Sequence, residues 1–151
     1  MTTELPDSHS DLLERPLFAH LATLRPDGSP QSSVMWFLWD GQRVLFSHTT
    51  NRQKYRNLLR DGRISFHVQD PDSPYRTLEV RGQVESMDPD PEAAFYRSLQ
   101  ERYGLVMPVF DADVRVVIAV KPTNYVAVDG GLTESETVAL TVLLTGLGNE
   151  E

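Results

Sequence analysis

The spacing of apolar positions changes several times along the chain, and each change marks a predicted element. Residues 17–24 are almost all apolar or small, which is typical of a strand buried on both faces. Residues 30–39 and 43–48 are also strand-like, and Asp40-Gly41 between them is a strong hairpin signal. The first third of the chain is therefore predicted to form antiparallel strands.

The apolar period then becomes helical. Tyr55, Leu58 and Leu59 are spaced i, i+3, i+4, which predicts a helix over residues 49–61 with Gly62 at its C-terminus. Further helices are predicted at residues 7–15, at 90–103 with Asp90 as N-cap and Gly104 behind, and as a short C-terminal segment. Further strands are predicted at 63–69, 75–87 with a bend at Gly82, 114–120 and 124–128.

Six or seven strands with only a few short helices favour an antiparallel β-barrel with helices on its rim. Tight turns cannot join parallel strands, which excludes a parallel sheet. We expect an N-terminal helix and arm over residues 1–16, a barrel domain over 17–130 and a C-terminal tail over 131–151. The sequence contains no dinucleotide-binding glycine motif, no phosphate loop, no serine-hydrolase elbow and no H-E-x-x-H zinc motif.

Composition narrows the classes of function. The 151 residues fit one domain, and 40% of them are hydrophobic, as in globular proteins. The absence of cysteine excludes a disulfide scaffold, a thiolate metal site and a cysteine nucleophile, so we expect a cytoplasmic protein. The net charge of −8 argues against nucleic acid or an anionic membrane as partner. The apolar run at residues 138–147 is too short to span a membrane.

A local cluster of cations stands out against this acidic background. Five of the 14 lysine and arginine residues fall within residues 52–63, three of them near the start of a predicted helix, where the helix dipole disfavours cations. Ser47, Thr49 and Thr50 place hydroxyl groups just before the same helix. This combination predicts a phosphate site. The alternative is a solvated basic helix face that offsets nearby acids.

For the other residues that could bind a metal or a ligand, the sequence favours structural roles. His20, His48 and His67 lie in or beside strands without metal-ligand spacing, so no metal site is predicted. The run MWFLW at residues 35–39 offers more aromatic surface than one small core can hide, which predicts a subunit interface. One of these aromatic rings could also form the wall of a site for a flat ring system.

Three segments in order resemble the FMN-binding split-barrel superfamily. They are AHLATLRPDGSPQSSVMWF (19–37), LFSHTTNRQKYRNLLRDGRISFHV (45–68) and YRTLEVRGQVE (75–85), with Gly62 where proline is usual. Within the superfamily the chain looks most like the pyridoxamine 5′-phosphate oxidase-related group that includes the actinobacterial F420-dependent oxidoreductases. The ending of the pyridoxamine phosphate oxidases proper is missing, which argues against vitamin B6 oxidation.

The resemblance implies a six-stranded, antiparallel Greek-key split β-barrel with short flanking helices, and a homodimer with two cofactors at the subunit interface. It also implies cofactor-binding roles for ten residues: Arg52 and Lys54 as phosphate anchors, Arg56 and Asn57 behind them, Ser47 and Thr49 on the approach, Gln31 and Ser33 beside the ring, and Tyr75 and Arg76 reaching over from the other subunit.

The implied function is hydride transfer from reduced coenzyme F420, or alternatively FMN, to a small organic acceptor. The long basic segment suits the polyanionic tail of coenzyme F420, and twelve arginines against two lysines are typical of the high-GC genomes of actinobacteria. No side chain is required as an acid, and His48 and Tyr75 are the only candidates for one. The alternatives are a flavin or F420 carrier without turnover and a non-enzymatic interaction barrel.

Overall fold

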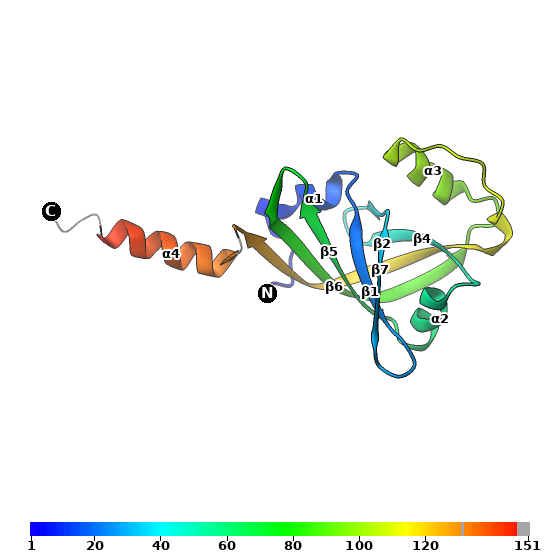
Figure 1. Ribbon diagram of the computed structural model, residues 1–151, viewed down its shortest axis with the longest axis horizontal. Coiled ribbons are helices and arrows are strands. Elements are labelled where there is room, and N and C mark those ends of the chain that lie inside the picture. The colour runs from blue at the N-terminus through cyan, green and yellow to red at the C-terminus, as the bar shows by residue number, and fades with distance from the viewer. Residues whose placement is uncertain (131, 148–151) are drawn as a thin grey trace.

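The computed structural model describes residues 1–130 and 132–147. One antiparallel sheet dominates it, with the strand order β2-β1-β5-β6-β7-β4-β3 and with β8 paired to β7 (Figure 1). The strands are β1 (Ala19–Leu24), β2 (Pro30–Met35), β3 (Leu38–Trp39), β4 (Val44–Thr49), β5 (Arg63–Asp70), β6 (Ser73–Pro89), β7 (Arg115–Asp129) and β8 (Leu132–Thr133). Six of these strands are six residues or longer.

The sheet curls into an open barrel rather than a closed one. Its end strands β2 and β3 are joined through Trp36 and Phe37 but do not extend the hydrogen-bonded path to each other. The predicted split-barrel class is thus confirmed. The core lies inside the curl and includes Phe66, whose ring contacts those of Phe46 and Phe37 with centroids 5.5 and 6.3 Å apart.

The expectation that residues 17–24 are buried on both faces is wrong. In β1, Ala19, Leu21 and Thr23 are buried while His20 is exposed. A barrel strand turns alternate side chains to the core and to the outside, so a run of small or apolar residues can still be buried on one face only.

The long strands pair with local irregularities that let the sheet curl. The two strands predicted over 114–120 and 124–128 form the single strand β7, whose register against β6 shifts next to Gly82. A Cβ at Gly82 would lie 2.7 Å from the carbonyl oxygen of Lys121, so only glycine allows this close approach. The predicted bend at Gly82 is confirmed. The Asp40-Gly41 hairpin is also confirmed, with Gly41 at a φ of 94°.

The first two helical segments are shorter than predicted. The segment 7–15 divides into the 3₁₀ turn η1 (Asp7–His9) and α1 (Asp11–Glu14), and the central helix α2 spans only Gln53–Arg60. Gly62 does not cap α2, because Asp61 already has an extended backbone there and Gly62 has no positive φ. Gly62 is instead packed so closely that a Cβ would collide with the Gln83 side chain.

The helix α3 (Ala94–Tyr103) begins later than its predicted N-cap. The Asp90 carboxylate nevertheless accepts the backbone N–H groups of Phe95 and Tyr96, at 3.4 and 3.2 Å. Gly104 ends the helix with a φ of 68°, as predicted. The 3₁₀ turn η2 (Ala112–Val114) then leads into β7.

The C-terminal helix α4 (Glu134–Leu147) projects away from the barrel (Figure 1). Its apolar side chains, among them Val138, Val142 and Leu143, are exposed. None of the helices described here is long and apolar enough to cross a membrane.

Candidate functional site

A pocket of about 320 Å³ opens where β2, β4 and the start of α2 meet α3 and the beginning of β7. Arg52 of the basic segment lines this pocket, which combines apolar walls with charged and polar groups. Its lining residues are Val34, Met35, Trp36, Ser47, His48, Arg52, Tyr96, Leu99, Leu105, Met107 and Arg115.

Lys54 lies against one wall of this pocket as a buried cation without a counter-charge. Its residue is only 6% exposed, and its Nζ lies 2.9 Å from the Met35 sulfur, which is a weak acceptor. Among the described residues, no carboxylate pairs with Lys54 or with Arg52. Burial, and secondarily Arg52, lower the pKa of Lys54 to about 8. The free pocket therefore holds positive charge that a bound anion would neutralise.

His48 is buried beside these cations and is neutral at physiological pH. Burial lowers its pKa to about 3, and the charges of Lys54, Arg52 and Arg115 add to this effect. An imidazole with this pKa does not supply an imidazolium as proton donor near neutral pH. Its Nε2 is buried without a hydrogen-bond partner, which leaves it free to bind a polar group of a ligand.

Two further buried hydroxyl groups near this end of the barrel have no partner: Ser33 Oγ and Thr49 Oγ1. Ser33 lies two residues from Met35 on the same face of β2, and Thr49 lies two residues beyond Ser47 on β4. Buried polar atoms are nearly always hydrogen-bonded in folded proteins. Unsatisfied polar atoms beside unneutralised cations fit a polar, anionic cofactor bound between β2, β4 and α2.

Hydrogen bonds to β1 and β2 hold α2 in place. Asn57 is fully buried, and it donates to Gln31 Oε1 at 2.9 Å and to Thr23 Oγ1 at 3.1 Å. Gln53 Nε2 in turn donates to Asn57 Oδ1 at 2.8 Å. Gln31 and Asn57 thus tie α2 to β1 and β2. This network fixes the direction in which Lys54, three residues before Asn57, projects.

The structure brings most of the predicted site residues to one end of the barrel. Ser47 and Arg52 line the pocket, Lys54 touches its wall through Met35, and Ser33, Thr49, Gln31 and Asn57 lie on the surrounding strands and helix. The exposed Arg56 donates to Gln53 Oε1 at 3.1 Å.

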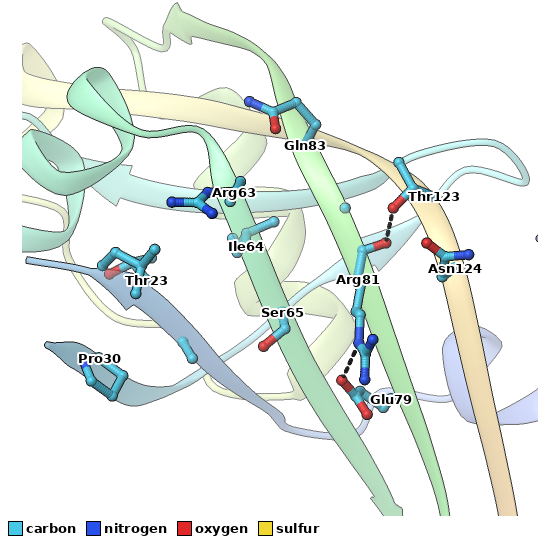
Figure 2. Close-up of a pocket in the computed structure, with 13 residues that line it drawn as sticks. Thr23, Pro30, Arg63, Ile64, Ser65, Glu79, Arg81, Gln83, Thr123 and Asn124 are labelled. Atoms are coloured by element: carbon cyan, nitrogen blue, oxygen red, sulfur yellow. Dashed lines mark hydrogen bonds and ion pairs between the residues drawn. The ribbon is translucent and has the colours of Figure 1, made fainter. Parts of the chain in front are cut away.

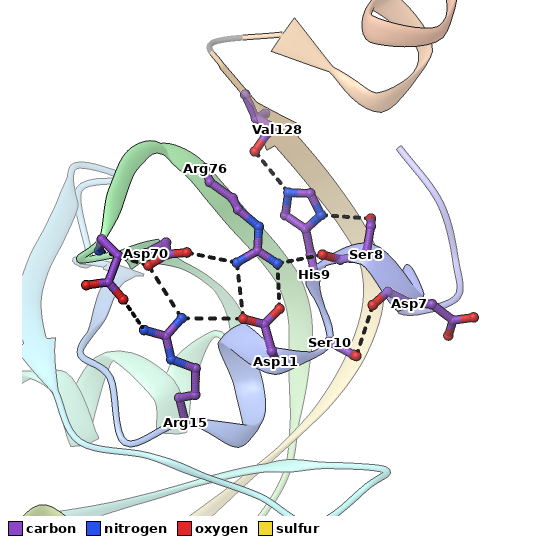
Figure 3. Close-up of polar contacts among 10 residues, drawn as sticks. Asp7, Ser8, His9, Ser10, Asp11, Arg15, Asp70, Arg76 and Val128 are labelled. Atoms are coloured by element: carbon purple, nitrogen blue, oxygen red, sulfur yellow. Dashed lines mark hydrogen bonds and ion pairs between the residues drawn. The ribbon is translucent and has the colours of Figure 1, made fainter.

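Tyr75 and Arg76 lie elsewhere in the chain, next to the N-terminal arm. Arg76 lies between Asp11 and Asp70, with Nη1 3.0 Å from Asp70 Oδ2 (Figure 3). Its hydrogen bond is the main cause that lowers the pKa of Asp11. Tyr75 is exposed. Within one chain neither residue meets the pocket, and their reach into a partner's site remains a prediction.

Sequence reasoning did not single out Arg115 and Tyr96, which line the same pocket. Arg115 is paired with Thr49 across the β4–β7 ladder, so their proximity depends on strand register and has no signal in linear spacing. Trp36 stacks on Tyr103 with ring centroids 4.9 Å apart, and this contact between distant parts of the chain likewise has no signal in linear spacing.

A larger hollow of about 490 Å³ lies on the sheet between β1, β5, β6 and β7 (Figure 2). Its cations are already neutralised, because Arg81 pairs with Glu79 at 2.7 Å and Arg63 pairs with Asp61 at 2.7 Å. It therefore lacks the unpaired charge that marks the smaller pocket. No group of three potential metal ligands occurs among the residues described.

The sheet topology defines the class as a split-barrel protein. The family model of pyridoxamine 5′-phosphate oxidase matches residues 5–129, so the chain belongs to that family. No curated protein matches the chain.

The solved structures that are similar to the chain include the following three. One called F420 reductase is 52% identical, with a TM-score of 0.79, over 80% of this chain and 98% of its own. A conserved hypothetical protein of Mycobacterium tuberculosis is 26% identical, with a TM-score of 0.66. This match covers 84% of this chain and 86% of that protein's chain. A candidate pyridoxamine 5′-phosphate oxidase of Listeria innocua, 22% identical with a TM-score of 0.65 over 82% and 98%, shares the fold. The family and the relative called F420 reductase together support a flavin- or F420-related oxidoreductase.

Replacing Lys54 by methionine should stabilise the ligand-free protein while weakening cofactor binding. The pKa of Lys54 falls from 10.5 to about 8, so removing its charge at pH 7 should raise the free energy of unfolding by about 1–3 kcal/mol. The gain should fade as the pH rises toward 10.5, because the folded protein then loses the buried charge. Urea unfolding of the ligand-free protein measures this gain.

The matched control is Lys121→Met, which removes the other, exposed lysine and should change stability little. A Lys54→Met protein that is less stable than its parent would assign Lys54 a structural role instead.

Proposed function

We propose that the protein is an oxidoreductase that binds coenzyme F420, or alternatively FMN, and passes hydride to a small organic acceptor in the cytoplasm. The observation that carries the proposal is the buried Lys54 without a counter-charge, next to Arg52 and to unsatisfied polar atoms of β2 and β4. The relative named F420 reductase supports coenzyme F420 over FMN.

The protein's own part is to bind, orient and exclude water. When bound, the cofactor supplies the hydride chemistry. Lys54 and Arg52 would bind its phosphate, and the N-terminus of α2 would add its positive dipole. Ser33 and Met35 on β2 would contact its ring, and Trp36 would supply an apolar wall. Because His48 is neutral, we assign protonation of the product to solvent.

Titration of the purified protein with coenzyme F420 and with FMN, followed by absorption or fluorescence, tests the proposal. Arg52→Ala should weaken both ligands about ten- to hundredfold, since a charge-assisted bond to phosphate contributes about 1.5–3 kcal/mol. Arg60, an exposed residue that donates to the Leu24 carbonyl, lies farther along α2. Arg60→Glu should weaken coenzyme F420, whose carboxylate-rich tail continues past the phosphate, and leave FMN nearly unchanged.

The control for these titrations is Arg97→Ala, an exposed arginine on α3 outside the pocket lining. Binding of neither ligand by the parent protein would refute the proposal and favour an interaction barrel. Tight binding without reduction of any acceptor would favour a carrier.

We also propose that the site is completed in a homodimer, but the original reason for expecting one is wrong. Phe37 of the MWFLW run is 0% exposed in the core, and Trp36 stacks on Tyr103, so a single chain hides most of this surface. The more exposed apolar side chains include Phe110, at 92%, with Val106 in the loop after α3, and several of α4. Such patches are typical of interfaces.

Sedimentation velocity at micromolar concentration should show a dimer. Burial of the exposed apolar surfaces of α4 and of the loop after α3 is the expected driving force. Phe110→Asp should then shift the equilibrium toward monomer, whereas Lys121→Asp, at a position that is also exposed but polar, should not. A parent protein that sediments as a monomer would refute the proposed interface.

A further inference from the structure

A second wall of the pocket carries a cation from a distant part of the chain. Arg115 is the first residue of β7, and its side chain is 12% exposed. Its Nη1 donates to Ser47 Oγ over 3.3 Å, so it reaches the end of β4 that adjoins α2. Arg115 and Arg52 are the two cations that line this pocket.

The Arg115 guanidinium is fixed before any ligand arrives. Its Nε and Nη2 donate to the two carboxylate oxygens of Asp111, at 2.9 and 3.1 Å. Its central carbon lies 3.6 Å from the centre of the Tyr96 ring, on which it stacks. Asp111 occupies one edge of the guanidinium, which leaves Nη1 for Ser47 and the pocket. A fork held in this way loses little side-chain entropy when it binds an oxyanion.

The charge of Arg115 acts inside the pocket even though Asp111 is its partner. It is one of the three cations that disfavour protonation of His48, together with Lys54 and Arg52. Three cations thus surround one imidazole, and Asp111 is their only ion-pair partner among the described residues. The neighbouring Nε2 of His48 is buried and unpartnered. The excess positive charge of the pocket therefore comes from Lys54 and Arg52, and the paired Arg115 adds a fixed donor on another wall.

We propose that Arg115 is a third phosphate anchor, which binds through Nη1, together with Ser47 Oγ, an oxygen of the phosphate that Lys54 and Arg52 bind from the side of α2. This inference rests on the proposed function and adds β7 to the elements that build its site. A phosphate offers several oxygens at once, and a rigid arginine fork matches them in geometry and charge. The ligand would then bridge β4, β7 and α2.

The test compares ligands that differ only by the phosphate. Arg115→Gln should weaken FMN about ten- to hundredfold while riboflavin, which lacks the phosphate, changes less than about twofold. For coenzyme F420 the matched ligand is its deazaflavin fragment without phosphate, and the same contrast is expected. Arg97→Gln, on the exposed face of α3, is the control and should leave all four affinities unchanged. Thermal unfolding of each variant checks that it is folded.

Each other outcome would overturn the inference. If Arg115→Gln weakened ligands with and without phosphate equally, Arg115 would contact the ring system or serve folding. A loss for coenzyme F420 alone would assign it to the carboxylate tail, and unchanged affinities would leave it as a brace for Asp111 and Tyr96. A parent protein that binds none of the four ligands would instead refute the proposed function, which makes the two failures distinguishable.

Discussion

The site depends on one unfavourable feature, the burial of the Lys54 ammonium without an acid to pair with it. Burying a charge costs free energy unless a partner compensates, and here the ammonium donates to the Met35 thioether, a weak acceptor. The depressed pKa of Lys54 expresses that cost. A protein can keep such a residue only if the rest of the fold is stable enough, and a binding partner of opposite charge is the simplest reason to keep it.

The surrounding fold holds this cation in place. Asn57, one turn further along α2, is fully buried and bonded to both β1 and β2, so α2 cannot rotate to bring Lys54 into solvent without breaking those bonds. On the other side, the register of β4 against β7 places Arg115 at the strand end that carries Ser47 and His48. Away from the site, the N-terminal arm is attached to the barrel, because Arg76 of β6 forms an ion pair with Asp11 of α1 (Figure 3).

Local signals in the sequence were sufficient for much of this fold. The Asp40-Gly41 hairpin, the bend at Gly82 and the glycine that ends α3 follow from backbone demands that few residues can meet. The basic segment was also visible in the sequence. Which of its cations is buried was not, because the burial of Lys54 depends on Met35, nineteen residues earlier on β2.

Features that arise from pairing between distant strands had no linear signal. Arg115 joins the pocket only through the β4–β7 ladder, and β7 runs unbroken through Pro122 because a register shift against β6 accommodates it. The burial of the aromatic run at residues 35–39 was underestimated for a related reason. Tyr103, more than sixty residues later, provides the ring that covers Trp36.

Proton uptake on cofactor binding tests the central claim most directly. At pH 9 most of Lys54 is neutral in the free protein, given a pKa of about 8, and a bound phosphate should restore its charge. Calorimetric titrations in buffers of different ionisation enthalpy should therefore show uptake of about one proton per site at pH 9, little uptake at pH 6.5, and none attributable to the site in Lys54→Met. Binding without any difference in proton uptake between the parent and Lys54→Met would contradict the account.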